Sequence, residues 1–334
     1  MNKFKFYFIV ISTLGVLFSC KEKDDTSVEA VRAYSTQYAT DIALIEGYLN
    51  NHYIENAGST DDQDVKLSLI PTGGTQASIM TYLNLPTLPS LTFIEVNLHG
   101  VNYKVYYLKL KDGDAVNGKT PKRVDLVLAS YDGSYLAKDA EPKRFEYVPY
   151  PENYFDLSRT IVGWQEIFPF FTSGVISENP GPNGPIYTGF GAGVMFLPSG
   201  LGYFNITTAT IPAYSPLIFS FKLYDAKKSD QDGDKIYSDD EDLNGDENFT
   251  NDDTDGDGIQ NYFDADDDGD GYLTRNEIKK PTGAPGLSLY YPYNPVIDNP
   301  DTTIDETEES GIPDCSGDGT SLTRLRRHLD PTCP

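Results

Sequence analysis

Acidic residues at regular spacing are the clearest chemical feature of this 334-residue sequence. The stretch Asp230–Glu277 holds 19 acidic residues against Lys235 and Arg275, which leaves a local net charge of −17. Four windows in it fit the pattern D-x-[DN]-x-[DN] with an acid at position 12. They are Asp230–Glu241 ("DQDGDKIYSDDE"), Asp242–Asp253 ("DLNGDENFTNDD"), Asp253–Asp264 ("DTDGDGIQNYFD") and Asp266–Glu277, within "DADDDGDGYLTRNE".

This spacing is typical of calcium loops. Ca²⁺ takes roughly six to eight oxygen ligands, and alternate side chains can point inward where a glycine permits the turn at position 6. Gly271 supplies it in the last window, whereas Lys235 and Glu247 stand there in the first two. A solvated acidic linker is the alternative. The expected Ca²⁺ ligands are Asp230, Asp232, Asp234, Glu241, Asp242, Asn244, Asp246, Asp253, Asp255, Asp257, Asp264, Asp266, Asp268, Asp270 and Glu277.

The windows abut, so they leave no room for the flanking helices of paired EF-hands. The region therefore resembles thrombospondin type 3-like aspartate repeats, in which the chain wraps around a row of ions. That resemblance implies calcium with a structural role, because a calcium sensor works by moving helices. Any activity is then expected upstream of this segment.

The N-terminus reads as an export signal. "MNKFKF" supplies two lysines, and the apolar run "FYFIVISTLGVLF" is too short to span a bilayer. The ending "LFSC" resembles a bacterial lipobox, which implies acylation of Cys20 and a lipid anchor in the membrane. The following "KEKDD" resembles the signal that sends some Bacteroidetes lipoproteins to the cell surface. We expect an outer membrane lipoprotein, facing the periplasm or the cell surface; an ordinary signal peptide is the alternative.

The two remaining cysteines and the net charge limit which kinds of chemistry and which partners the sequence supports. Cys315 and Cys333 are left as a pair in an exported chain, which predicts a disulfide in the C-terminal segment, with two free thiols as the alternative. The sequence has no C-x-x-C and no Cys/His cluster, so it indicates neither zinc binding nor thiol redox chemistry. No basic patch balances the net charge of −25, which argues against a nucleic-acid partner.

The rest of the chain must position any active residues. Apolar residues at i+3 and i+4 spacing predict a helix over Glu29–Tyr53, with Tyr34, Tyr38, Ile42, Ile45 and Leu49 on one face. From about Val101 alternating apolar residues predict strands: "VNYKVYYLKL", "RVDLVLASY" with Val124, Leu126 and Leu128 on one face, "GAGVMFLP" and "PLIFSFKLYDA".

One short helix is expected near Val162–Glu166, and Thr172–Gly189 is expected to be a long irregular loop. The fold class is therefore α+β, an antiparallel sheet with one short helix packed on it. We expect five regions: a signal peptide at 1–19, a linker and helical segment at 20–97, the sheet domain at 98–228, the repeats at 229–278 and a tail at 279–334.

Three ordered segments of the sheet domain resemble FKBP-type peptidyl-prolyl isomerases. They are "IVGWQEI" (Ile161–Ile167), "GAGVMFLPSGLGY" (Gly191–Tyr203) and "IPAYSPLIFSFKLYDA" (Ile211–Ala226). The helix with "DIALIEGYLNN" also resembles the leader of Bacteroidetes FKBP-type lipoproteins. The resemblance implies an FKBP-like sheet wrapped on a short helix and a binding site for a proline-containing polypeptide.

The resemblance also implies roles for single residues. Trp164 would form the floor under the proline ring, and the Ile161 N–H and the Tyr203 hydroxyl would each hold a substrate carbonyl. The walls would be Tyr131, Phe145, Tyr203, Ile211 and Phe219. Glu146 stands where the family has Asp, one methylene shorter, and the aromatic residue before the tryptophan segment is either Tyr154 or Phe155.

Three functions remain open from sequence. The first is a membrane-anchored prolyl isomerase or chaperone for exported proteins. The second is an inactive FKBP-like module that binds a protein partner, and the third is a purely structural, calcium-stiffened surface protein. A deep open pocket would favour catalysis, whereas a pocket filled by the loop Thr172–Gly189 would favour binding.

Overall fold

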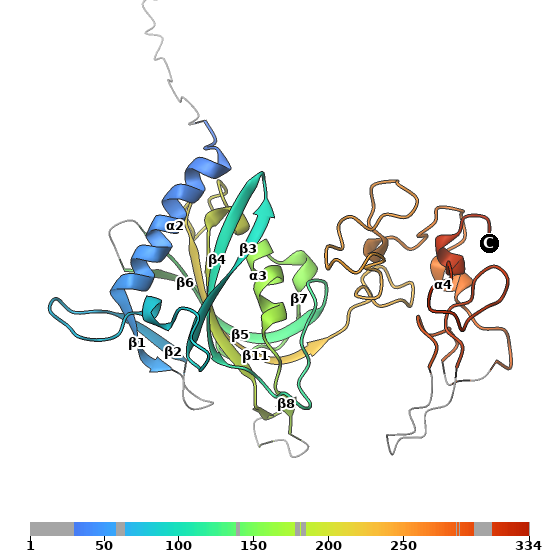
Figure 1. Ribbon diagram of the computed structural model, residues 1–334, viewed down its shortest axis with the longest axis horizontal. Helices are drawn as coiled ribbons and strands as arrows, with labels where there is room; N and C mark the ends of the chain where they lie inside the picture. The colour runs from blue at the N-terminus through green and yellow to red at the C-terminus, as the bar shows by residue number, and fades with distance from the viewer. Residues whose placement is uncertain are drawn as a thin grey trace, which may run out of the picture. The chain divides into compact units, whose positions relative to one another are not determined.

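The computed structural model describes residues 30–57, 64–137, 141–177, 181, 185–284, 286, 288–296 and 309–333 (Figure 1). Cys20, the expected signal peptide at 1–19 and the acidic residues after Cys20 lie outside the described residues, so these predictions stay predictions. The chain divides into two units, residues 1–32 and residues 33–334, and every element below belongs to the second.

The first described helix, α2 (Tyr34–Asn51), is shorter at both ends than predicted. His52 is already extended, and Tyr53 lies in strand β1 (His52–Ala57), which pairs with β2 (Val65–Leu69). This hairpin was not predicted from the sequence, because its alternation is short and polar residues interrupt it. The predicted apolar face is confirmed, with all five residues packed against core residues: Tyr34, Tyr38, Ile42, Ile45 and Leu49.

A single antiparallel sheet dominates the fold, in the strand order β3-β4-β10-β11-β5-β6, with the short β7 also paired to β5. The predicted α+β class is confirmed. The strands are β3 (Ser90–Leu98), β4 (Val101–Lys111), β5 (Leu126–Tyr135), β6 (Lys143–Val148), β7 (Phe155–Asp156), β10 (Gly191–Leu197) and β11 (Leu217–Lys227).

Strand β3 precedes the predicted start of the sheet domain at residue 98. It pairs with β4 along its whole length, from Ser90 opposite Lys109 to Leu98 opposite Val101. The two prolines just before it, Pro86 and Pro89, favoured a connection rather than a strand in the sequence. The sheet therefore begins earlier than expected.

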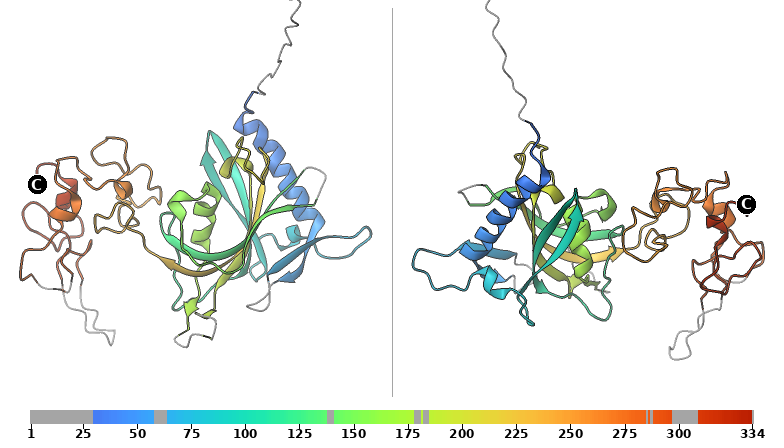
Figure 2. Two further views of the ribbon diagram at one scale, coloured as in Figure 1. Left: turned by 180° about the vertical axis from the view of Figure 1, so that it is seen from behind. Right: turned by 45° about the horizontal axis from the view of Figure 1, so that its top comes forward.

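The two faces of the sheet bury two different cores. Along β4, Tyr103 and Tyr107 face the larger core, which also contains helix α3 (Val162–Ile167), whereas Tyr106 and Leu108 face the smaller core under the C-terminal half of α2. The two helices lie on opposite faces of the sheet (Figures 1 and 2). The predicted alternation on β11 is confirmed, because all four of its inward residues belong to the larger core: Leu217, Phe219, Phe221 and Leu223.

On strand β5, Leu126 and Leu128 share one face, as predicted. The alternate residues Val127, Ala129 and Tyr131 lie on the other face and belong to the larger core. Val124 lies before the strand and packs instead with Phe249 and Tyr262 of the acidic segment.

Short elements complete the described chain. The expected loop Thr172–Gly189 contains two paired strands, β8 (Val175–Ile176) and β9 (Tyr187–Thr188), so it is not wholly irregular. The acidic segment holds only one turn of α-helix, α4 (Thr274–Glu277). The 3₁₀ turns are Ile79–Tyr82, Leu157–Arg159, Phe168–Phe170, Ser199–Leu201, Asn261–Phe263 and Arg327–Leu329.

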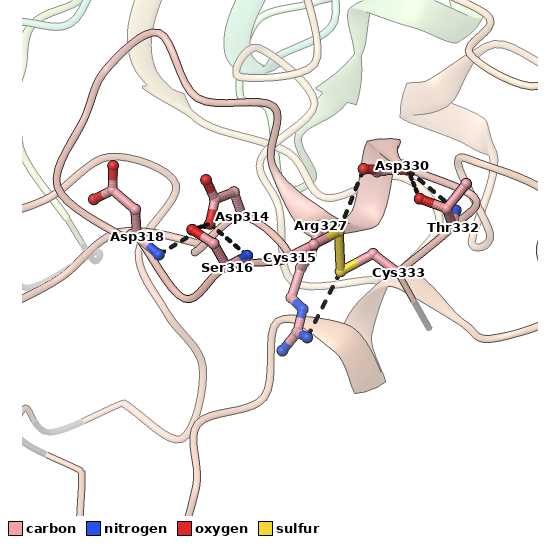
Figure 3. Close-up of a disulfide and its surroundings, with 8 residues drawn as sticks. All are labelled: Asp314, Cys315, Ser316, Asp318, Arg327, Asp330, Thr332 and Cys333. Carbon is pink, nitrogen blue, oxygen red and sulfur yellow. Dashed lines mark hydrogen bonds between the residues drawn. A yellow bond between two sulfur atoms is a disulfide. The ribbon is translucent and has the colours of Figure 1, made fainter.

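The C-terminal tail packs against the acidic segment through a small apolar cluster of Ile236, Ile278 and Ile312. Its predicted disulfide is confirmed, since Cys315 and Cys333 are bonded with their Cα atoms 5.5 Å apart (Figure 3). Arg327 lies beside this bond, with a guanidinium nitrogen 3.9 Å from the sulfur of Cys333.

Candidate functional site

An aromatic pocket forms where α3 meets the curved face of the sheet. Trp164 projects from α3 into the larger core and is 5% exposed. The helix can approach this closely because residue 163 is glycine: a Cβ there would lie 2.4 Å from Cδ1 of Leu197. Gly133 serves the same purpose on β5, since a Cβ would lie 2.6 Å from the Phe145 ring. Gly163 thus lets α3, which carries Trp164, pack close to Leu197, and Gly133 leaves room for the Phe145 ring.

Ring contacts fix the indole on three sides. The centroid of Trp164 lies 5.1 Å from Tyr131, 5.3 Å from Phe219 and 5.6 Å from Phe155, all in edge-to-face geometry. Phe145 packs edge-on against Phe219 at 5.5 Å. Such contacts stabilise by about 0.5–1.5 kcal/mol each beyond their buried area, so the floor and walls are held without a bound ligand.

The resulting cavity has a volume of ≈ 320 Å³. Seven of the eight residues that the FKBP resemblance singled out line it: Tyr131, Phe145, Glu146, Ile161, Trp164, Tyr203 and Phe219. The eighth, Ile211, is buried in the adjoining core rather than in the lining.

Three further lining residues were not assigned from the sequence. Phe155 lines the pocket, whereas Tyr154 donates its hydroxyl hydrogen bond to Asp225, which settles the choice between the two aromatics. Arg159 and Thr160 complete the rim. Their position directly before Ile161 in the chain was the available signal, but neither residue type stands out in the sequence.

The polar groups of the pocket lie at its edge. Among the described residues, no acceptor is found for the Ile161 N–H and no hydrogen-bond partner for the Tyr203 hydroxyl. Burial, followed by the nearby Glu146 carboxylate, raises the pKa of both Tyr131 and Tyr203 above the ordinary tyrosine value. Both phenols therefore stay protonated at neutral pH and can donate hydrogen bonds.

This arrangement suits binding rather than bond cleavage. Among the described residues, the lining contains no histidine, cysteine, serine or lysine, and its one carboxylate is Glu146. The pocket instead offers an apolar floor for a ring and two donors at the rim for carbonyl oxygens.

The acidic segment forms four loops of one conformation. The glycine at position 4 has positive φ in each loop (Gly233 +83°, Gly245 +73°, Gly256 +77° and Gly269 +66°). Position 6 is also left-handed in all four, including Lys235 at +87° and Glu247 at +61°, beside Gly258 and Gly271. The first two loops therefore adopt the turn without the glycine that the pattern calls for, at a cost that L residues normally avoid.

Unsatisfied carboxylates mark the first and last loops. At positions 1, 3, 5 and 12 of both loops, buried side-chain oxygens have no hydrogen-bond partner among the described residues. They belong to Asp230, Asp232, Asp234, Glu241, Asp266, Asp268, Asp270 and Glu277. Buried polar oxygens without partners are costly, and this all-oxygen donor set fits a hard divalent cation. These loops could hold a metal ion.

The two middle loops, Asp242–Asp253 and Asp253–Asp264, differ in the acidic residue that closes each of them near position 12. Burial, followed by the nearby carboxylates of Asp257 and Asp255, raises the pKa of Asp264, which closes the third loop. In the second loop Asp252, which is buried, faces Asp242 and Asp246, while Asp253 groups with Asp255 and Asp257. The carboxylate of Asp246 and the amide of Asn244 are hydrogen-bonded to Asn251.

Four groups of three carboxylates could each hold a metal ion: Asp230, Asp232 and Asp234; Asp234, Glu241 and Asp267; Asp253, Asp255 and Asp257; and Asp266, Asp268 and Asp270. Within each group, the possible ligand atoms lie within 4.8 Å of one another. Asp267 was not among the expected ligands, because it falls at position 2 of its loop.

Comparisons with known proteins add the following. A family model described as "BamM C-terminal" matches residues 231–304, and no curated protein matches the chain. The similar solved structures include a peptidyl-prolyl cis-trans isomerase from Pseudomonas syringae pv. tomato, at 13% identity and TM-score 0.33, covering 59% of this chain and 98% of that one. They also include FkpA from Escherichia coli, at 18% identity and TM-score 0.32, covering 58% of this chain and 62% of that one.

Both TM-scores are below 0.5, so these two structures carry no argument about activity. No helix among the described residues is both long enough and apolar enough to span a membrane.

Proposed function

We propose that this protein is an FKBP-type peptidyl-prolyl cis-trans isomerase that acts on exported, proline-containing polypeptides. One observation carries the proposal: none of the described residues of Thr172–Gly189 lines the aromatic pocket. That segment pairs with itself, and Gly174 donates a backbone hydrogen bond to Leu223 on β11. A pocket that these residues leave unfilled favours catalysis over the inactive binding module.

The pocket suits the physics of prolyl isomerisation. Rotation about an X–Pro bond faces a barrier of roughly 18–20 kcal/mol, because the planar amide is resonance-stabilised. The twisted amide is less polar, so a dry aromatic site favours it over the planar ground state. Trp164 would lie under the proline ring, and the Ile161 N–H and the Tyr203 hydroxyl would orient the neighbouring carbonyls.

NMR exchange on an X–Pro peptide, with the whole purified chain as catalyst, tests the proposal. Trp164→Leu removes the apolar floor and should abolish most of the acceleration. Tyr203→Phe removes one hydrogen bond of about 0.5–1.5 kcal/mol, which corresponds to roughly a three- to tenfold loss. Tyr272→Phe is the matched control, because Tyr272 is exposed in the acidic segment, and it should leave the rate unchanged.

Glu146→Asp separates the isomerase from the inactive binding module. It restores the residue of the FKBP pattern at the pocket wall, so it should raise the rate if the longer side chain crowds the cavity. A wild-type chain without any acceleration, together with no gain from Glu146→Asp, would favour the binding module.

Calcium is the proposed ligand of the acidic loops, with a structural role. The support is the all-oxygen donor set and the charge, since four divalent ions would bring +8 against the local −17. Titration calorimetry after chelation measures it directly. Binding should appear below about 1 mM, the upper range of extracellular calcium modules, and no heat up to that concentration would refute it.

A lipid on Cys20 is the proposed anchor, and the outer membrane, facing the periplasm or the cell surface, is the proposed location. The support is the lipobox-like "LFSC". Cys20→Ser should move the exported chain from the membrane fraction to the soluble fraction. Retention of the variant in the membrane fraction would contradict the anchor.

A further inference from the structure

Three carboxylates from distant loops meet in the interior of the acidic segment. Asp234 and Glu241 belong to the first loop, whereas Asp267 belongs to the fourth, and their ligand atoms lie within 4.8 Å of one another. They are 1%, 3% and 2% exposed, respectively. Asp267 occupies position 2 of its loop, a position that the calcium-loop pattern leaves out of the ligand set.

Each of the three carboxylates has at least one buried oxygen without a hydrogen-bond partner among the described residues. Oδ1 of Asp234 accepts a hydrogen bond from the Ile236 N–H at 2.7 Å, and Oδ2 of Asp267 accepts one from the Thr274 hydroxyl at 3.1 Å. The other oxygen of each, and both oxygens of Glu241, are buried with no partner among the described residues. One carboxylate oxygen of each aspartate thus accepts a hydrogen bond from the chain, and the other oxygen is left available to a ligand.

Among the described residues, the charges that act most strongly on Glu241 have the same sign as its own carboxylate. The strongest charge–charge influences on Glu241 come from other carboxylates, namely Asp234, Asp267, Asp232 and Asp230. Several buried anions without a paired cation are very costly. A bound cation removes that cost, and oxygen ligands with one potentially bidentate glutamate suit Ca²⁺.

We infer that Asp267 is a ligand of the ion bound by the first loop, so that one Ca²⁺ joins the first and fourth loops. Asp234 belongs both to this group and to the group with Asp230 and Asp232, which places the shared ion at the first loop. Ile236 of the first loop and Ile278, directly after the fourth loop, belong to one buried apolar cluster, which also connects these two loops. The inference rests on the proposed calcium binding and adds which loops an ion connects.

The test compares Asp267→Asn with Asp240→Asn in the full chain carrying Cys20→Ser. Asp240 is a matched control, because it lies at position 11 of the first loop, is paired with Lys228 and belongs to none of the four metal groups. Titration calorimetry with Ca²⁺ should show one site weakened at least tenfold in Asp267→Asn and unchanged in Asp240→Asn. The double variant Asp267→Asn, Glu241→Gln should lose no more sites than Glu241→Gln alone, because both residues hold one ion.

The unfolding midpoint is a second readout. The direction of its change distinguishes a Ca²⁺ ligand from a residue with a purely structural role. In chelator, Asp267→Asn should raise the unfolding midpoint, because it removes repulsion among buried carboxylates. In saturating Ca²⁺ the same change should lower the midpoint, because it removes a ligand. A lower midpoint in both conditions would show a structural role only and overturn the inference.

The outcomes of these experiments also distinguish failure of this inference from failure of the calcium proposal on which it rests. If the wild type binds no Ca²⁺, the calcium proposal fails and the inference fails with it. If the wild type binds Ca²⁺ and Asp267→Asn binds the same number of ions with the same affinities, only the link between the first and fourth loops is refuted.

Discussion

Gly163→Ala tests whether close helix-to-sheet packing builds the pocket. Gly163 lies in α3 directly before Trp164, and a Cβ there would meet Cδ1 of Leu197 at 2.4 Å and Cδ2 at 2.7 Å. Leu197 is fully buried, so its side chain has little free space to move into. We expect the added methyl group to push α3, and the indole with it, away from the sheet.

The magnitude follows from two opposing effects. Overpacking a core costs about 1–3 kcal/mol, whereas replacing a helical glycine by alanine contributes about 0.5–1 kcal/mol in favour of folding. The net destabilisation is therefore expected to be about 0–2.5 kcal/mol. Prolyl isomerase activity should fall as well, because the floor of the pocket shifts.

A double-mutant cycle with Leu197→Ala isolates the steric contact. Leu197→Ala alone should cost about 2–5 kcal/mol, but in that background Gly163→Ala should be neutral or stabilising, because the clash is gone. Urea denaturation monitored by fluorescence and by circular dichroism measures all four proteins. An equal cost of Gly163→Ala in both backgrounds would refute the reasoning.

Two further predictions concern the C-terminal half. Burial and neighbouring carboxylates raise the pKa of Glu241 to about 11 and that of Asp267 to about 9. The metal-free folded chain therefore holds protons that the unfolded chain releases above about pH 4–5. Its free energy of unfolding in chelator should fall as the pH rises from 5 to 9, and saturating Ca²⁺ should remove most of that dependence; a chelated chain that is equally stable at both pH values would contradict this. Reduction of the Cys315–Cys333 disulfide, which closes a separation of 18 residues, should destabilise the tail by about 3 kcal/mol while leaving isomerase activity unchanged. Proteolysis of the tail under reducing and non-reducing conditions measures this, and equal cleavage rates would count against it.

The sequence was most informative where the pattern is local. The alternation on β4 and β11, the helix at Val162 and the spacing of the aspartates each depend on neighbouring residues, and the structure has all of them. Strand β3 was missed because its partner, β4, stabilises it, and the preceding prolines outweighed its own alternation. The hairpin β1–β2 was missed because local polarity hides its pairing.

The site residues show the same difference between local patterns, which the sequence displays, and long-range contacts, which it does not. Family-like motifs pointed to most of the pocket lining, because those motifs record which residues meet in space. Phe155 could not be separated from Tyr154 by sequence, since the choice depends on which ring finds Asp225 as a partner. Asp267 was missed for a related reason: its partners lie in a loop that is distant in sequence, and no short-range spacing encodes such a contact.

The edge position of β6, the strand that carries Phe145 and Glu146, affects how easily one wall of the pocket can move. β6 ends the sheet and pairs only with β5, whereas Phe219 lies on β11 between two strands. Edge segments open locally at a lower free energy than central strands. One wall of the pocket is therefore expected to exchange its amide protons faster than the floor, so that the cavity has a rigid side and a compliant side. On the proposed function, small displacements of β6 would accommodate polypeptides of differing sequence around the proline without disturbing the indole.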